Sequence, residues 1–188
     1  MKNVVIFASG SGSNAENIIN YLEENTNFRV NLILCNNPKA FVLERAKKLN
    51  ISALTFNRTA FYTHNFVLET IKTAQPDLIV LAGFLWKFPE NIIEAFPNKI
   101  INIHPALLPK YGGKGMYGDH VHNAVVANNE TESGITIHYV NENYDEGAII
   151  HQATCPVLPT DTADDVAAKV HELEYEHFPK IITQLLSE

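Results

Sequence analysis

Short apolar segments that alternate with helical patterns are the feature that most constrains this sequence. Residues 3–9 and 77–83 are apolar almost without interruption, which is typical of strands buried on both faces of a sheet. The same criteria predict further strands over 29–36, 51–56 and 99–103, and helices over 13–25, 41–50 and 61–74. Parallel strands need long crossover connections, which helices of this length provide. The order therefore predicts a parallel sheet covered by helices on both faces.

The pattern changes after residue 130. Residues 133–140 alternate between apolar and polar side chains, and a turn sequence separates them from a strand predicted over 148–158. A last helix is predicted over 163–186, with a capping box formed by Thr162 and Asp165. Its side chains at helical spacing are Val166, Val170, Leu173, His177, Ile181 and Leu185. The whole pattern predicts one α/β domain, residues 1–188. Its Rossmann-like, mostly parallel sheet should end in an antiparallel C-terminal strand pair.

Charge and composition exclude several classes of protein. The formal net charge is −7 and the basic residues are scattered, so no basic surface for nucleic acid is predicted. No apolar segment reaches the length of a membrane span, and the N-terminus lacks the pattern of a signal peptide. Cys35 and Cys155 form no CxxC motif and are predicted to be reduced and buried. We therefore expect a cytoplasmic protein that binds neither nucleic acid nor membrane.

A glycine-rich loop, ASGSGSNA, joins the first predicted strand to the first helix. Gly10, Gly12 and Ala15 satisfy the relaxed fingerprint G-x-G-x-x-G/A, and Ser13 is predicted to cap the helix. Backbone N–H groups of such a loop and the positive end of the helix favour an anion. The acid that a dinucleotide site needs after the second strand is missing from LCNNP. A phosphomonoester is therefore a better prediction than NAD, and a plain tight turn is the alternative.

Asn102 and His104 stand where the fifth predicted strand ends, directly before Pro105. Ligands of parallel sheets bind beyond the carboxyl ends of the strands, and residues two apart in an extended segment point to the same side. The amide and the imidazole should therefore face one crevice. Asp145, in the turn sequence NYDEGA, would keep that imidazole protonated if it lay beside it. The alternatives are a strand end with satisfied hydrogen bonds and ordinary turn chemistry at Asp145.

Four sequences together, SGSGSN, VLAGF, NIHPALLPKY and the late DEG, resemble the glycinamide ribonucleotide formyltransferases of purine biosynthesis, a family of folate-dependent formyltransferases. The resemblance covers nearly the whole chain in order and spacing. It implies that Asn102, His104 and Asp145 are the catalytic residues. It also implies that the substrate phosphate and ribose are held by four residues, namely Gly12, Ser13, Asn14 and Glu174.

The same resemblance implies that the formyl donor is 10-formyltetrahydrofolate, that the substrates are small molecules and that no metal is required. The folate would contact Leu85, Trp86, Lys87, Phe88, Asn102, Asn141, Glu142, Asn143, Tyr144 and Asp145. Trp86 stands where bacterial relatives commonly have an arginine beside the pterin pocket. Aromatic and apolar walls suit a flat heterocycle, although Trp86 is also a candidate for a loop aromatic that anchors the sheet edge. A monomer or a homodimer is expected.

The chemistry that follows is direct attack of the substrate amine on the formyl carbon. Negative charge then collects on the formyl oxygen, and Asn102 and protonated His104 are predicted to donate to it. Such donors are typically worth about 3 kcal/mol each in the transition state. Asp145 is expected to raise the pKa of His104 and, through a water, to help move the proton from the attacking amine to the leaving nitrogen.

Other functions remain possible on the sequence alone. A formyltetrahydrofolate deformylase, which is a hydrolase, would share the three catalytic residues, and a non-catalytic nucleotide-binding module would use only the glycine loop. His120 and His122 form an HxH motif, but on a helix their side chains should diverge, so a metal site is not favoured.

Overall fold

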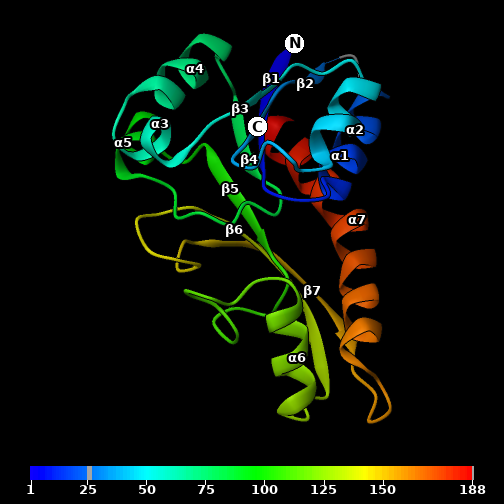
Figure 1. Cartoon of the computed structure of the whole chain (residues 1–188). Coiled ribbons are helices and arrows are strands. Elements are labelled where there is room, and N and C mark those ends of the chain that lie inside the picture. Colours follow the sequence, from blue (N-terminus) through cyan, green and yellow to red (C-terminus); the bar gives the residue numbers. More distant parts are fainter. Residues whose placement is uncertain (25–26, 188) are drawn as a thin grey trace.

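The computed structural model describes residues 1–24 and 27–187 and contains a seven-stranded sheet (Figure 1). The strand order is β3-β2-β1-β4-β5-β6-β7. The strands are β1 (Lys2–Ala8), β2 (Phe28–Cys35), β3 (Ala53–Thr55), β4 (Leu78–Leu81), β5 (Ile100–His104), β6 (Glu132–Tyr139) and β7 (Ile149–Pro156). The first five pair in parallel, whereas β6 is antiparallel to both β5 and β7. The predicted fold class is therefore confirmed.

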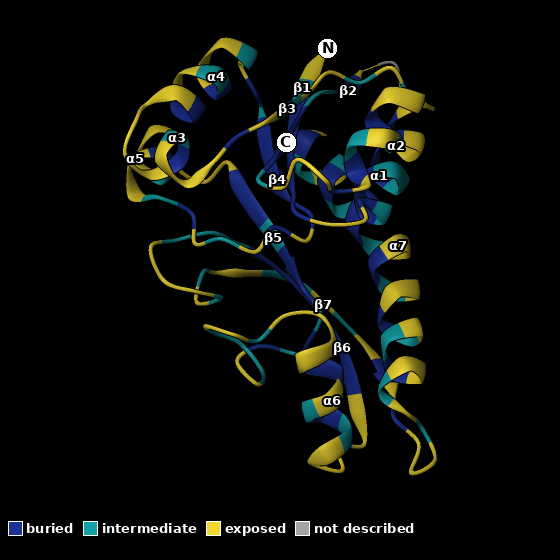
Figure 2. Ribbon diagram, viewed as in Figure 1, coloured by how far each residue is buried: buried dark blue, intermediate teal, exposed yellow. Residues whose placement is uncertain are grey.

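Helices cover both faces of the sheet. They are α1 (Ser13–Glu23), α2 (Val42–Lys48), α3 (Arg58–Tyr62), α4 (Phe66–Ala74), α5 (Glu90–Ala95), α6 (Asp119–Ala127) and α7 (Ala163–Ser187). Side chains of α1, α2, α6 and α7 pack into one core, and those of α3, α4 and α5 into a second core on the opposite face. Figure 2 shows the central strands buried and the outer sides of the helices exposed. Both cysteines are buried and free, as predicted.

Two helix predictions need correction. The helix predicted over 61–74 is two helices, because the Asn57 side chain accepts a hydrogen bond from Ala60 N and starts α3 earlier, while α3 already ends at Tyr62. The short helix α5 was not predicted. The helix predicted over 13–25 is confirmed as far as Glu23, and the end of that range lies outside the described residues.

The C-terminal helix α7 begins as predicted and is buried along a different line. Asp165 Oδ2 accepts a hydrogen bond from Thr162 N at 2.8 Å, and Thr162 Oγ1 accepts one from Asp165 N at 3.2 Å, so the capping box is confirmed. From position 174 onward, however, the buried line runs one residue later than predicted, through Glu174, Phe178, Ile182 and Leu186. The predicted positions Leu173, Ile181 and Leu185 are partly buried against the same core, so the buried side of the helix is wider than the predicted line. As a result, a carboxylate lies on the buried side of α7.

None of the helices within the described residues is long and apolar enough to cross a membrane.

Candidate active site

A cleft of about 770 Å³ lies beyond the carboxyl ends of β1, β4 and β5. Its walls are the glycine loop (residues 10–14), the start of the loop after β4, the end of β5, residues 113–122 and one side of α7. These segments are far apart in the sequence, and the parallel sheet brings their ends to one edge. The predicted crevice is therefore present, and it contains both the glycine loop and the Asn102–His104 pair.

The glycine loop turns sharply at Gly12, which has a positive φ of 74°. A Cβ atom at this position would lie 2.4 Å from Val42 Cγ2, so the close packing of α2 against the loop requires glycine. Val42 N also donates a hydrogen bond to Gly10 O at 3.2 Å. The prediction that Ser13 caps α1 is wrong. Gly12 is the N-cap, and Ser13 is already the first helical residue.

Asn14 and Glu174 join the glycine loop to α7. Asn14 Nδ2 donates a hydrogen bond to Glu174 Oε2 at 2.9 Å, and both side chains are buried. His171 Nδ1 donates to the same oxygen at 2.7 Å. All three residues line the cleft. His171 was not predicted, although its position three residues before Glu174 is the helical spacing at which side chains meet.

At the other end of the cleft lie Asn102, His104 and Asp145, and the structure brings all three together. His104 is 4% exposed, and its Nδ1 lies 3.7 Å from Asp145 Oδ2. The same carboxylate oxygen accepts a hydrogen bond from Gly113 N at 2.9 Å. The Asp145 backbone has a positive φ of 55°, and its side chain reaches His104 at the end of β5. The turn residue of the sequence is thus a residue of the cleft.

His138 is a further residue of this end that the sequence did not reveal. The antiparallel register pairs Asn102 with His138, and Asn102 Nδ2 donates a hydrogen bond to His138 Nε2 at 3.2 Å. His138 Nδ1 donates to Tyr139 O at 2.8 Å, which fixes the ring so that Nε2 accepts. His138 Nε2 also lies 3.7 Å from Asp145 Oδ1. No local pattern could have found it, because the pairing joins strands that are about thirty residues apart.

Burial and charge act in opposite directions on His104. Burial lowers the pKa of His104, whereas the Asp145 carboxylate and the Tyr111 carbonyl raise it, and the net direction is down. Asp145 therefore acts on the pKa of His104 in the predicted direction, and burial outweighs its effect. His104 Nε2 donates to Tyr111 O at 2.7 Å, so Nδ1 is the nitrogen that faces Asp145.

Asp145 is held in its ionised form. Burial raises the pKa of this carboxyl. The neighbouring His138 and His104 rings and the Gly113 N–H together lower it by more, so the net pKa is below its ordinary value. The cleft therefore places a buried imidazole, whose neutral form is favoured by burial, 3.7 Å from a carboxylate oxygen.

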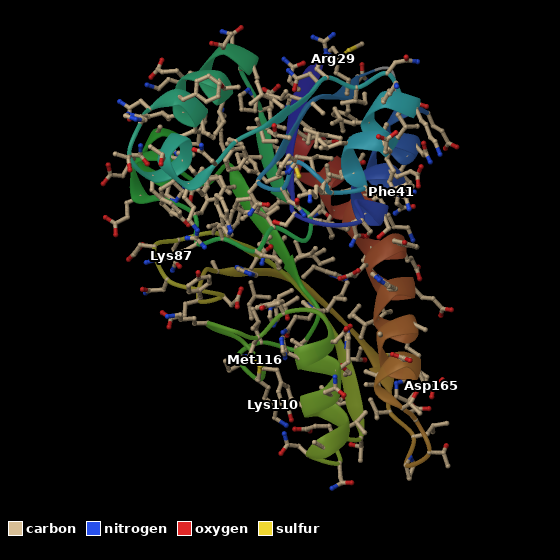
Figure 3. All side chains as sticks on the ribbon, viewed as in Figure 1. Arg29, Phe41, Lys87, Lys110, Met116 and Asp165 are labelled. Atoms are coloured by element: carbon tan, nitrogen blue, oxygen red, sulfur yellow. The ribbon has the colours of Figure 1, made fainter. Side chains whose placement is uncertain are left out.

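The loop after β4 presents only part of the predicted folate contacts to the cleft. Among the described residues, Leu85 lines the cleft, whereas the three residues that follow it do not. Phe88 is 3% exposed and belongs to the aromatic core beneath the loop. Trp86 packs on the same core, and the Arg58 guanidinium lies 4.6 Å from the centre of its ring. Lys87 is exposed on the loop, as Figure 3 shows.

The loop before β7 also presents only part of its predicted folate contacts to the cleft. Tyr144 and Asp145 line the cleft. In the part of the chain that the structure describes, the other three predicted contacts, Asn141, Glu142 and Asn143, lie outside the cleft wall. Asn143 N donates to Asn141 Oδ1 at 3.0 Å, so Asn141 stabilises the turn that presents Tyr144.

The two histidines of the HxH motif differ in burial. His122 is 6% exposed, whereas His120 is exposed and packs edge-on against the Tyr117 ring. Residues 1–24 and 27–187 contain no group of three or more His, Cys, Asp or Glu side chains that could hold a metal ion. Burial lowers the pKa of His122 and favours its neutral form.

A Rossmann-like sheet with a glycine loop, an amide, an imidazole and a carboxylate in one cleft defines an α/β enzyme that acts on small molecules. The family model described as formyl transferase matches residues 2–182. The chain is 36% identical to the phosphoribosylglycinamide formyltransferase of Bacillus subtilis, over 99% of this chain and 95% of the relative. The chain belongs to the formyl transferase family.

Solved structures agree with this assignment. The crystal structure of phosphoribosylglycinamide formyltransferase from Bacillus halodurans superposes with a TM-score of 0.90 and 32% identity, over 100% of this chain and 96% of the other. Glycinamide ribonucleotide transformylase 1 from Geobacillus kaustophilus gives a TM-score of 0.89 and 33% identity, over 99% of both chains.

Proposed function

We propose that this chain transfers the formyl group of 10-formyltetrahydrofolate to the amine of N1-(5-phospho-D-ribosyl)glycinamide, a step of purine biosynthesis. The observation that carries the proposal is one continuous cleft that joins the glycine loop to Asn102, His104 and Asp145. The names of the relatives supply the identity of the two substrates. The cleft supports this identity because it has an anion-binding end and an acid–base end.

The ribonucleotide would lie at the glycine loop. The first N–H groups of a helix have no intrahelical partners, and Gly12, Ser13 and Asn14 at the start of α1 line the cleft, so this helix start suits a phosphate. The Glu174 carboxylate stands beside Asn14 and offers acceptors to the ribose hydroxyls. With the phosphate and ribose held in this way, the glycinamide amine would extend along the cleft toward His104.

The folate would lie at the other end. Leu85 and Tyr144 offer an apolar and an aromatic wall for the pterin, and the backbone of the loop after β4 offers hydrogen-bonding groups. Side chains that do not line the cleft, such as Trp86 and Phe88, would support this loop from below. In this arrangement the formyl group would lie among Asn102, His104 and Asp145.

In the proposed reaction the amine lone pair forms a bond to the formyl carbon, and the tetrahedral intermediate then breaks its bond to N10 of the folate. Asn102 donates to the formyl oxygen as negative charge develops there, and His104 Nε2 joins it by exchanging its bond to Tyr111 O for one to that oxygen. This charge, added to that of Asp145, raises the pKa of His104 against the opposing effect of burial. Asp145 takes the proton of the attacking amine, directly or through a water, and this proton then passes to N10, the leaving nitrogen of the folate.

His138 would orient Asn102 in this reaction. Since His138 Nε2 accepts one amide hydrogen of Asn102, the other hydrogen of that amide is directed away from His138 and is available to the formyl oxygen. The ring is itself fixed by its bond to Tyr139 O. This arrangement supplies a donor that needs little reorganisation.

The test is a formyl-transfer assay with the ribonucleotide and 10-formyltetrahydrofolate, run with and without the amine substrate. We expect formylated ribonucleotide in the complete reaction and negligible formate release when the amine is absent, because the cleft places the amine rather than water at attack distance. Rapid formate release without the amine would support the deformylase alternative. Binding of NAD at the glycine loop without formyl transfer would support a nucleotide-binding module.

A further inference from the structure

The carboxylate of Glu174 is buried, and a buried charge needs partners that compensate for the lost contact with water. Glu174 is 6% exposed, and burying an ionised carboxylate is costly unless it is paired and hydrogen-bonded. Asn14 supplies one hydrogen bond to Oε2, but an amide has no charge. Within the described residues Oε1 accepts no hydrogen bond, so this oxygen is left for a ligand in the cleft. A carboxylate that must bind a ligand therefore depends on a cationic partner.

His171 is that partner. Its Nδ1 donates to Glu174 Oε2 at 2.7 Å, a distance typical of a charge-assisted hydrogen bond. The imidazole ring stacks on Tyr175 with a centre-to-centre distance of 5.7 Å and an interplanar angle of 23°, which limits its rotation. The side chain is 56% exposed and lines the cleft. His171 thus connects the buried carboxylate to the open cleft.

The charged surroundings of His171 are simple. The groups that face His171 or line the same part of the cleft are Glu174 and Tyr175 on α7, uncharged Asn14 on α1, Asp119, His120 and His122 on α6, and Lys114 in the preceding loop. Of these, Glu174 is the group that makes contact through a hydrogen bond. That bond raises the pKa of His171 against the opposing effect of burial.

We propose that His171 is a positioning residue of the ribonucleotide end: its imidazolium holds the Glu174 carboxylate against Asn14, so that Oε1 is directed at the pentose hydroxyls of the substrate. The proposal rests on the proposed function, because it assigns His171 to the same substrate. It predicts that His171 acts on ribonucleotide binding and leaves the formyl-transfer step alone. It also predicts that this contribution depends on one proton.

The direction of the pH effect follows from the raised pKa. His171 is charged below its pKa, and as the pH rises through that value the cation is lost and Glu174 keeps only neutral donors. The second ionisation of the substrate phosphate has a pKa of about 6 and affects every variant equally. The informative quantity is therefore the ratio of the KM of a variant to that of the wild type at each pH.

Three variants distinguish a positioning role of His171 from a purely structural one. His171→Gln keeps a donor but no charge, His171→Lys keeps a charge at every pH of the assay, and His177→Gln is the matched control. His177 is on the same helix and bonds to His151 at 3.0 Å, and it is not among the residues that line the cleft. Thermal unfolding of each variant checks that it is folded.

We expect His171→Gln to raise the KM for the ribonucleotide about 10-fold at pH 6, with kcat and the KM for the folate within about 2-fold of wild type. At pH 9 the ratio should fall to about 2-fold, because the wild type has then lost the same proton. His171→Lys should stay near the wild type at pH 6 and bind the ribonucleotide more tightly than the wild type at pH 9. His177→Gln should behave as the wild type throughout.

A KM ratio that does not change with pH, or equal effects on both substrates, would overturn the proposal. Failure of His171→Lys to restore binding at pH 6 would also count against it. Wild-type protein that does not transfer the formyl group at all would overturn the proposed function instead, so the two failures are distinguishable.

Discussion

The two ends of the cleft are built in different ways. The proposed ribonucleotide end is formed by packed helices: Val42 of α2 packs closely against Gly12, and Glu174 of α7 is hydrogen-bonded to Asn14 of α1. The reaction end is formed by a strand end and loops, and two of its residues, Tyr111 and Asp145, have positive φ values of 56° and 55°. In the proposed function, the packed helices would fix where the ribonucleotide lies, whereas the strained loops place ionisable groups around a buried imidazole. Substitutions at the first end should therefore change KM, and those at the second end kcat.

The largest effect is expected from Asp145→Asn. Asparagine tolerates the left-handed backbone at this position and has the same shape, so the variant should fold and bind both substrates while it loses the proton acceptor. We expect kcat to fall about 10³-fold with little change in either KM. Steady-state kinetics measure this, and Glu146→Gln, an exposed neighbour, is the control. Near-normal turnover of Asp145→Asn would show that Asp145 is not catalytic.

Ser13→Glu should produce the next largest effect, and at the opposite end. A carboxylate on the first residue of α1 would repel the substrate phosphate, and we expect the KM for the ribonucleotide to rise about 100-fold while the KM for the folate stays nearly unchanged. Ser13→Ala is the matched control and should have a small effect, because backbone N–H groups provide most of the proposed contacts. Equal changes for both substrates would argue against a phosphate at this loop.

A smaller effect concerns a histidine pair outside both ends. Burial and the neighbouring His177 lower the pKa of His151 in the folded protein below the unfolded value. Stability is therefore intact above the unfolded pKa of about 6.5 and is lost as the pH falls through the window below it. His151→Gln should lose less stability than the wild type between pH 7.5 and pH 5.5, measured as the shift in urea midpoint. An equal loss in both proteins would contradict this assignment.

The smallest effect is expected at Trp86. Trp86 directly follows Leu85, which lines the cleft, and packs on the aromatic core beneath the loop. A bound non-reactive folate analogue should therefore change its emission slightly, and the ribonucleotide should change it less. Fluorescence titration with a free-tryptophan control for the inner-filter effect measures the change. If calorimetry shows that the analogue binds and the corrected emission does not move, Trp86 is not part of the folate site.

Local patterns are sufficient to predict much of the fold and half of the candidate site. The uninterrupted apolar segments identify the central strands, and the position of Asn102 and His104 at a strand end is enough to predict that they face the cleft. His138 could not be found in this way, because it reaches Asn102 only through the register of two antiparallel strands. The net direction of the shift in the pKa of His104 could not be predicted from the sequence either, because it depends on how deeply the ring is buried.

The cap of α1 shows a second kind of limit. A serine before a helical pattern usually predicts the N-cap, yet here the packing of Val42 forces the turn onto Gly12 one residue earlier. His171 is a different case. Its spacing to Glu174 is visible in the sequence, but only the structure shows that Glu174 is buried and that the two side chains form a hydrogen bond.

The central claim is that one cleft has a binding end and a reacting end, and the most direct test is a double-mutant cycle of Ser13→Glu and Asp145→Asn. The two side chains share no partner among the described contacts, so their effects on kcat/KM for the ribonucleotide, as free energies, should add within about 0.5 kcal/mol. In the double variant we expect the ribonucleotide KM of Ser13→Glu together with the kcat of Asp145→Asn. A coupling energy above about 1 kcal/mol, or a double variant no worse than one of the single variants, would contradict the division of the cleft into two ends.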